Sequence, residues 1–247
     1  MADWNDTGRR QTGFSSVPRA GDAVARRETF DAGLRSHMLS IYNYMASGVL
    51  LTGIVAMLTY QSGLAVNFAS GPLMWIVALS PLAFVMAMSF GLNKMSRGTL
   101  QILFWAFATV MGLSLSTIFL RFTGESIAAT FFATAGAFAG LSLFGYTTKK
   151  DLSGMGTFLV MGVIGLLIAM VINMFLGSST LGLVISFLGV LIFAGLTAYD
   201  TQRLKREYEY LRGTEFVGKA VIMGALSLYL DFINMFMFLL QFMGNRE

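Results

Sequence analysis

Long apolar stretches recur along the chain and are separated by short polar segments. A helix that crosses a bilayer needs about 20 predominantly apolar residues. Seven stretches meet this requirement, namely Leu39–Tyr60, Leu73–Leu92, Leu100–Leu120, Ile127–Tyr146, Met155–Leu176, Leu181–Tyr199 and Ala220–Met243. The pattern therefore predicts an all-α, polytopic membrane protein with seven transmembrane helices.

Composition agrees with this pattern. Of the 247 residues, 55% are hydrophobic and only 12% are charged, which is too little charge to cover a soluble domain of this length. We expect one seven-helix transmembrane domain over residues 37–247, preceded by a flexible cytoplasmic tail over residues 1–36. That polar tail has no apolar core or cleavage site of a secretory signal. Cysteine is absent, which excludes disulfides and thiolate chemistry.

The basic residues predict the orientation in the membrane. Cytoplasmic connections carry an excess of lysine and arginine. All but two of the 17 basic residues fall in the tail or in the second-to-third, fourth-to-fifth and sixth-to-seventh connections, and the exceptions are Arg121 and Arg246. Seven spans with a cytoplasmic N-terminus and an external C-terminus fit this alternation. The net charge of +4 is thus explained by orientation, without a nucleic-acid partner.

An ionisable residue inside a span is the strongest functional signal in a membrane sequence. Asp231 is such a residue, roughly eleven residues and on the order of 15 Å into the last span. A polar stripe of Gly224, Ser227, Asp231, Asn234 and Gln241 follows a spacing of three and four residues on that helix, with Phe238 in the remaining place. The stripe predicts either a polar pathway for an ion or a hydrogen-bonding seam that joins helices.

Asp200, at the end of the sixth predicted span, is the second candidate. Alone it fits a surface acid paired with Arg203, three residues further along. The next helix, however, returns Asp231 from the same side of the membrane. Two carboxylates that meet in a low dielectric share a proton and titrate as a unit, so Asp200 and Asp231 predict a pH switch if the two spans lie at compatible depths.

Lys94 and Arg97 end the second span and begin the next connection. The usual role of such residues is to extend toward the headgroups. The alternative is a cation that reaches inward and holds one of the two aspartates in its charged form.

Three segments of the chain form distinctive motifs. The last span contains ALSLYLDFINMF over residues 225–236, the sixth ends in YDTQRLK over 199–205, and the fourth-to-fifth turn reads KKDLS over 149–153. These segments resemble the Bax inhibitor-1 family. The first two motifs are specific, and the resemblance covers about residues 34–243.

The resemblance implies six helices around a central seventh and a pH-sensitive calcium leak. It assigns the pH-sensing pair to Asp200 and Asp231, which would bind calcium transiently, and a basic latch to Lys94, with Arg97 nearby. Calcium would be the permeant ion, and no tightly bound cofactor is expected. It also implies a bacterial inner (cytoplasmic) membrane as the location.

Two other function classes stay open. A non-conducting regulator would bind other membrane proteins, such as a membrane protease. An intramembrane aspartyl protease would also use two aspartates, but Asp231 lies in LDF instead of GxGD, and the prolines are only Pro18, Pro72 and Pro81. The motifs of common soluble enzymes are absent as well, so we do not expect an enzyme.

Overall fold

The computed structural model describes residues 20–69 and 71–245, and within these ranges the chain forms helices and turns without β-strands. The helices are α1 (Ala20–Gln61), α2 (Leu64–Phe68), α3 (Gly71–Gly91), α4 (Arg97–Leu115), the 3₁₀ helix η1 (Ser116–Leu120), α5 (Gly124–Thr147), α6 (Ser153–Leu176), α7 (Ser179–Leu211) and α8 (Val217–Met243). Seven of these helices are long and apolar enough to cross a membrane. The predicted fold class is therefore confirmed, whereas the short α2 was not predicted.

The described part of the chain falls into two units, with the boundary between Ser36 and His37. Helix α1 begins at Ala20, so its first turns fall within the predicted tail. Residues 1–19 lie outside the described residues, and the flexibility expected for residues 1–36 stays a prediction.

Polar side chains at the helix starts explain why short connections suffice. Ser96, Thr123 and Ser178 each accept a hydrogen bond from the backbone N–H three residues ahead, at the N-termini of α4, α5 and α7. Such caps satisfy backbone donors that have no partner inside the helix. At the end of α6, Gly177 adopts a left-handed conformation with a φ of 61°, which glycine adopts without steric cost.

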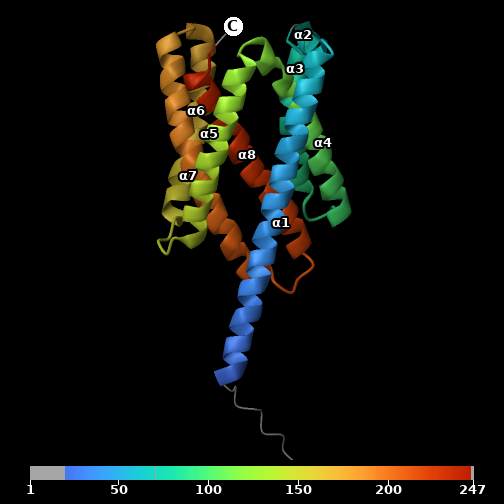
Figure 1. The fold of residues 1–247 in the computed structure, drawn as a ribbon, viewed down its shortest axis with the longest axis vertical. Helices are drawn as coiled ribbons and strands as arrows, with labels where there is room; N and C mark the ends of the chain where they lie inside the picture. The colour runs from blue at the N-terminus through green and yellow to red at the C-terminus, as the bar shows by residue number, and fades with distance from the viewer. Residues whose placement is uncertain (1–19, 70, 246–247) are drawn as a thin grey trace, which may run out of the picture. The chain divides into compact units, whose positions relative to one another are not determined.

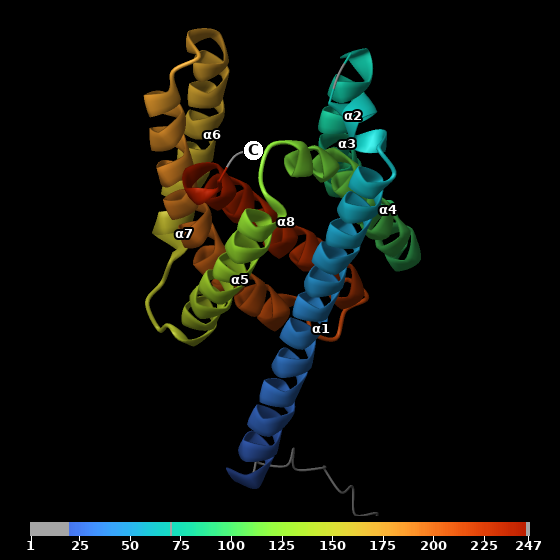
Figure 2. The ribbon, with the colours of Figure 1, turned by 45° about the horizontal axis from the view of Figure 1, so that its top comes forward.

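Helix α8 is the central helix of residues 37–247. In its most apolar stretch 72% of the residues are buried, against 39% or less in every other membrane-crossing helix. Figures 1 and 2 show α8 running between α5, α6 and α7 on one side and α1, α3 and α4 on the other. Within its polar stripe, Gly224 and Asp231 are buried, Ser227 and Asn234 are partly buried, and Gln241 near the end of the helix is exposed.

Two glycines bring α7 close to its neighbours just before Asp200. A Cβ at Gly145 of α5 would collide with the backbone carbonyl of Ala198, and one at Gly156 of α6 would collide with the ring of Tyr199. Small residues allow this close approach between membrane helices. The consequence is that α5 and α6 enclose the segment of α7 that carries Asp200.

The opposite side of α8 is joined to α1 and α4 by buried hydrogen bonds. The Tyr229 hydroxyl lies 2.7 Å from Thr52 Oγ1, which donates to the Ala108 carbonyl at 2.8 Å. Tyr229 and Asp231 are two residues apart on one helix and point to different neighbours. The hydrogen bonds of Tyr229 thus help to fix the rotation of α8 that directs Asp231 away from α1.

Candidate functional site

Asp200 lies inside the protein, although the sequence placed it at the end of a span. Helix α7 continues past Tyr199 as far as Leu211, and Asp200 is only 4% exposed. The segment after Asp200 is rich in lysine, arginine, glutamate and leucine, all of which favour helix. The helix ends just before Gly213, whose φ is 79°. A fall in hydropathy marked the end of the apolar stretch, but it did not mark the end of the helix.

Asp231 is similarly buried, with 5% of its surface exposed. Its Oδ2 atom has no hydrogen-bond partner within the described part of the chain. The carboxylate lies within electrostatic range of both Asp200 and Arg203. The structure thus brings the two predicted aspartates into one buried cluster, which we call the aspartate pair.

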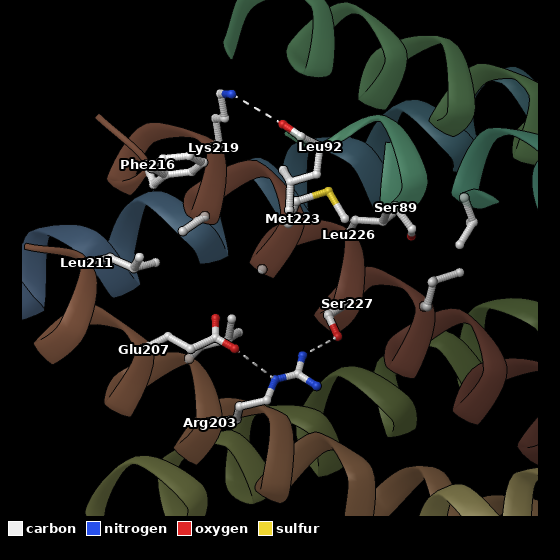
Figure 3. Close-up of a pocket in the computed structure, with 15 residues that line it drawn as sticks. Ser89, Leu92, Arg203, Glu207, Leu211, Phe216, Lys219, Met223, Leu226 and Ser227 are labelled. Atoms are coloured by element: carbon white, nitrogen blue, oxygen red, sulfur yellow. Dashed lines mark hydrogen bonds and ion pairs between the residues drawn. The ribbon is translucent and has the colours of Figure 1, made fainter. Parts of the chain in front are cut away.

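Arg203 and Ser227 bind directly to Asp200. The Arg203 guanidinium approaches both carboxylate oxygens, with Nη1 3.1 Å from Oδ1 and Nη2 3.3 Å from Oδ2. The same Nη2 donates to Ser227 Oγ at 3.0 Å, and the Ser227 hydroxyl donates to Asp200 Oδ2. Ser227 therefore connects the central helix to the ion pair on α7. Figure 3 shows its contact with Arg203.

A cavity of about 380 Å³ opens beside this cluster, between the ends of α3 and α7 and the start of α8. Its polar wall includes Arg203, Glu207 and Ser227. Figure 3 shows Arg203 between the other two side chains, with its Nε atom 3.4 Å from Glu207 Oε1. Apolar side chains such as Met223 form most of the remaining wall. We call this space the α3–α7–α8 cavity.

Lys94 and Arg97 do not contact the aspartate pair through an ion pair among the described residues. Lys94 is exposed in the turn between α3 and α4, and Arg97 is exposed at the first position of α4. Arg97 instead packs its side chain against Gly218 at the start of α8. The cation that contacts Asp200 is Arg203, and the latch role of Lys94 and Arg97 stays a prediction.

The polar stripe of α8 divides into different contacts. Ser227 joins Asp200, as described above, and Gln241 accepts a hydrogen bond from Ser186 of α7 at 3.4 Å. Asn234 donates to the Leu230 carbonyl of its own helix at 2.8 Å. Of the three neutral hydrogen-bonding side chains in the stripe, Ser227 and Gln241 thus bind to α7, so part of the stripe is a seam between helices.

The C-terminal end of α7 also holds the turn between α5 and α6. The Gln202 side chain donates to the Lys150 carbonyl at 2.7 Å and accepts from the Leu152 N–H at 2.9 Å. Arg206 pairs with Asp151 at 2.7 Å. Hydrogen bonds from Ser153 and Arg206 lower the pKa of Asp151 from 3.8 to about 2. This contact group is separate from Arg203, and it fixes the turn that begins α6.

Sequence reasoning treated Arg203 as a surface partner of Asp200 and did not consider Glu207. The signal was present in their spacing, because residues three and four positions apart lie on the same face of a helix. Asp200, Arg203 and Glu207 follow that spacing. It was not used because the helix was expected to end at Tyr199.

Comparison with known proteins supports a common origin across nearly the whole chain. A family model described as "Inhibitor of apoptosis-promoting Bax1" matches residues 34–247. An uncharacterised protein of Rickettsia prowazekii is 44% identical over 231 residues, which cover 91% of this chain and 95% of that protein. The inner membrane protein YbhL of Escherichia coli is 42% identical over 234 residues, covering 93% and 98% of the two chains.

A more distant relative gives the same result. An uncharacterised membrane protein of Streptococcus pyogenes is 35% identical over 221 residues, which cover 88% of this chain and 96% of that protein. The relatives from Escherichia coli and Streptococcus pyogenes are named as membrane proteins, and the seven long apolar helices of this chain agree with that location. The resemblance noted in the sequence motifs is thereby confirmed, and the chain is a multi-pass membrane protein that belongs to the Bax inhibitor-1 family.

Proposed function

We propose that the protein is a pH-sensitive leak for calcium, in which Asp200 and Asp231 form a proton-sharing pair. The observation that carries this proposal is the burial of two carboxylates close together, with 4% and 5% of their surfaces exposed. Ionisable residues inside membrane helices are costly and are found mostly on pathways for ions or protons. A packing role alone does not require two acids, because neutral hydrogen-bonding side chains join helices at lower cost.

The pair offers oxygen ligands to a hard cation. Calcium binds six to eight oxygens, commonly from carboxylates, hydroxyls, carbonyls and water. Asp200 and Asp231 supply carboxylate oxygens, and Ser227 adds a hydroxyl beside them. Water would provide the rest, so calcium is treated as a passing ion and not as a resident cofactor. Protons compete for the same oxygens, which makes the flux depend on pH.

The proposed setting is a bacterial cytoplasmic membrane, with the N-terminus in the cytoplasm and the C-terminus outside. The distribution of basic residues supports this orientation. The α3–α7–α8 cavity then faces the cytoplasm, because it lies at the end of α7 and the start of α8. Lys94 and Arg97 lie on the same side, where they add positive charge near the cavity.

The test is calcium flux into liposomes that contain the purified protein, between about pH 5 and pH 8, the range in which a shared proton is expected to exchange. The Asp231→Asn variant is measured beside the wild type. We expect pH-dependent flux in the wild type and a changed flux and pH profile in the variant. If the Asp231→Asn variant had the same flux as the wild type at every pH, the proposed mechanism would be contradicted.

Absence of flux above that of empty liposomes would favour a different class of function. The protein would then be a regulator that binds other membrane proteins, and co-purification of a membrane protease would be the next measurement. Cleavage of a peptide substrate, blocked by an aspartyl-protease inhibitor, would instead indicate the protease alternative.

A further inference from the structure

The α3–α7–α8 cavity stops short of the aspartate pair. Its wall includes Arg203 and Ser227 but neither Asp200 nor Asp231. Both wall residues bind Asp200, with Arg203 Nη1 3.1 Å from Oδ1 and Ser227 donating to Oδ2. A cation that enters the cavity thus meets a guanidinium before it meets either carboxylate of the pair. Figure 3 shows the Arg203 side chain at the cavity wall.

More than one carboxylate competes for the positive charge of Arg203. Three carboxylates, those of Asp200, Asp231 and Glu207, lie within electrostatic range of a single guanidinium. The two terminal nitrogens of Arg203 are used by Asp200 and Ser227. Its Nε lies 3.4 Å from Glu207 Oε1 and makes no hydrogen bond. Glu207 is therefore a second acceptor, which forms an ion pair with Arg203 but receives no hydrogen bond from its Nε atom.

We propose that Arg203 closes the calcium path by occupying the cation position next to Asp200, and that Glu207 is the acceptor to which it moves when the path opens. This inference rests on the proposed function. It assigns Arg203 as the internal plug, and Glu207 as the positioning residue for its open state.

The geometry allows such a movement with a small displacement. The Arg203 side chain is 38% exposed, toward a cavity of about 380 Å³. Since Glu207 lies one helical turn beyond Arg203, rotation about the side-chain bonds can direct the guanidinium fork to it without moving the backbone. Asp200 then loses its resident cation, and a carboxylate without a partner in a buried site favours another positive charge.

Substitutions that replace a charged side chain with a neutral polar one test the plug. Arg203→Gln removes the resident cation, and we expect its calcium flux into liposomes at neutral pH to exceed that of the wild type by at least about fivefold, the lower end of typical coupling between sites. Glu207→Gln removes the negative charge of the second acceptor, which weakens its attraction for the guanidinium, and its flux should fall below that of the wild type. The double variant should behave as Arg203→Gln does, because Glu207 is proposed to affect the flux through the position of Arg203.

Arg206→Gln is the matched control. Arg206 is a cation on the same helix that pairs with Asp151, so its removal changes the charge of the cytoplasmic end without opening the path. If Arg206→Gln raised the flux as much as Arg203→Gln, surface charge would explain the effect and the plug would be overturned.

The remaining outcomes separate the two proposals. Wild-type flux that depends on Asp231 but is unchanged in Arg203→Gln and in Glu207→Gln overturns the plug and leaves the leak standing. No flux in the wild type or in any variant overturns the leak, and the plug with it. If Arg203→Gln does not fold, as judged by gel filtration, Glu207→Gln decides alone. Its side chain is 43% exposed, and unchanged flux in that variant overturns the plug.

Discussion

At the scale of single residues, Ser227 explains how an ion pair between neighbours on one helix comes to lie inside the protein. Pairs three residues apart are common on helix surfaces and contribute little to stability. Here Ser227 of α8 donates to Asp200 and accepts from Arg203. The carboxylate thus exchanges hydration for hydrogen bonds from two helices, which burial of a charged group requires.

Removing this hydroxyl should weaken the fold. For Ser227→Ala we expect the free energy of unfolding to fall by about 1–3 kcal/mol, because a buried acceptor loses one of its donors. Thermal unfolding in detergent, followed by circular dichroism, measures the change. Ser47→Ala is the control, since that hydroxyl is exposed and bonds only to the Asn43 carbonyl of its own helix. Equal unfolding midpoints for the two variants would contradict the role given to Ser227.

Asp151 supports a prediction about acid stability. Its folded pKa of about 2 lies below the ordinary 3.8, so the ionised form stabilises the folded state. This contribution is complete above about pH 4 and is lost as the pH falls toward the folded pKa. In Asp151→Asn, unfolding temperatures measured between about pH 2 and pH 5 should show a weaker pH dependence than in the wild type. Glu209→Gln, at another exposed acid, is the control and should keep the wild-type profile.

At the scale of elements, hydropathy predicted the order and number of the long helices but placed some of their ends incorrectly. The prediction for the sixth span ended at Tyr199, where charged residues begin, whereas α7 continues to Leu211. A transfer scale measures affinity for lipid and does not measure helix propensity. The depth of Asp200 could therefore be found only from the structure. The short helix α2 could not be predicted either, because its five residues are too few to produce a periodic signal.

The close approach of α5 to α7 leads to a test of helix packing. Gly145→Ala places a methyl group against the Ala198 carbonyl, and forced separation of the backbones should cost about 1–3 kcal/mol. The matched control is Gly140→Ala on the same helix, where an added Cβ meets nothing within 4 Å. We expect a lower unfolding temperature for the first variant only. Because Ala198 precedes Asp200 by two residues, Gly145→Ala should also alter the flux.

At the scale of the whole molecule, the sequence identified the central helix but not the composition of its site. Asp231 and its polar stripe indicated that α8 faces protein, and its 72% buried stretch agrees. Spacing within a helix does not reveal how neighbouring helices rotate against one another. Those rotations decide which side chains meet. They place Arg203 and Glu207 at the wall of a cavity beside Ser227 and leave Lys94 exposed. Residues on one helix were thus predictable, and contacts between helices were not.

The orientation of the bundle is also testable, because the chain has no cysteine of its own. Single cysteines introduced by Lys149→Cys and Glu125→Cys lie at exposed positions near opposite ends of α5 and therefore report on opposite sides of the membrane. Lysine and arginine cluster in cytoplasmic connections, so a membrane-impermeant maleimide should label Glu125→Cys in right-side-out vesicles and Lys149→Cys only in inverted ones. The reverse pattern would place the α3–α7–α8 cavity outside. Calcium would then meet Arg203 from the external side, and Glu207 would open the path to that side instead of to the cytoplasm.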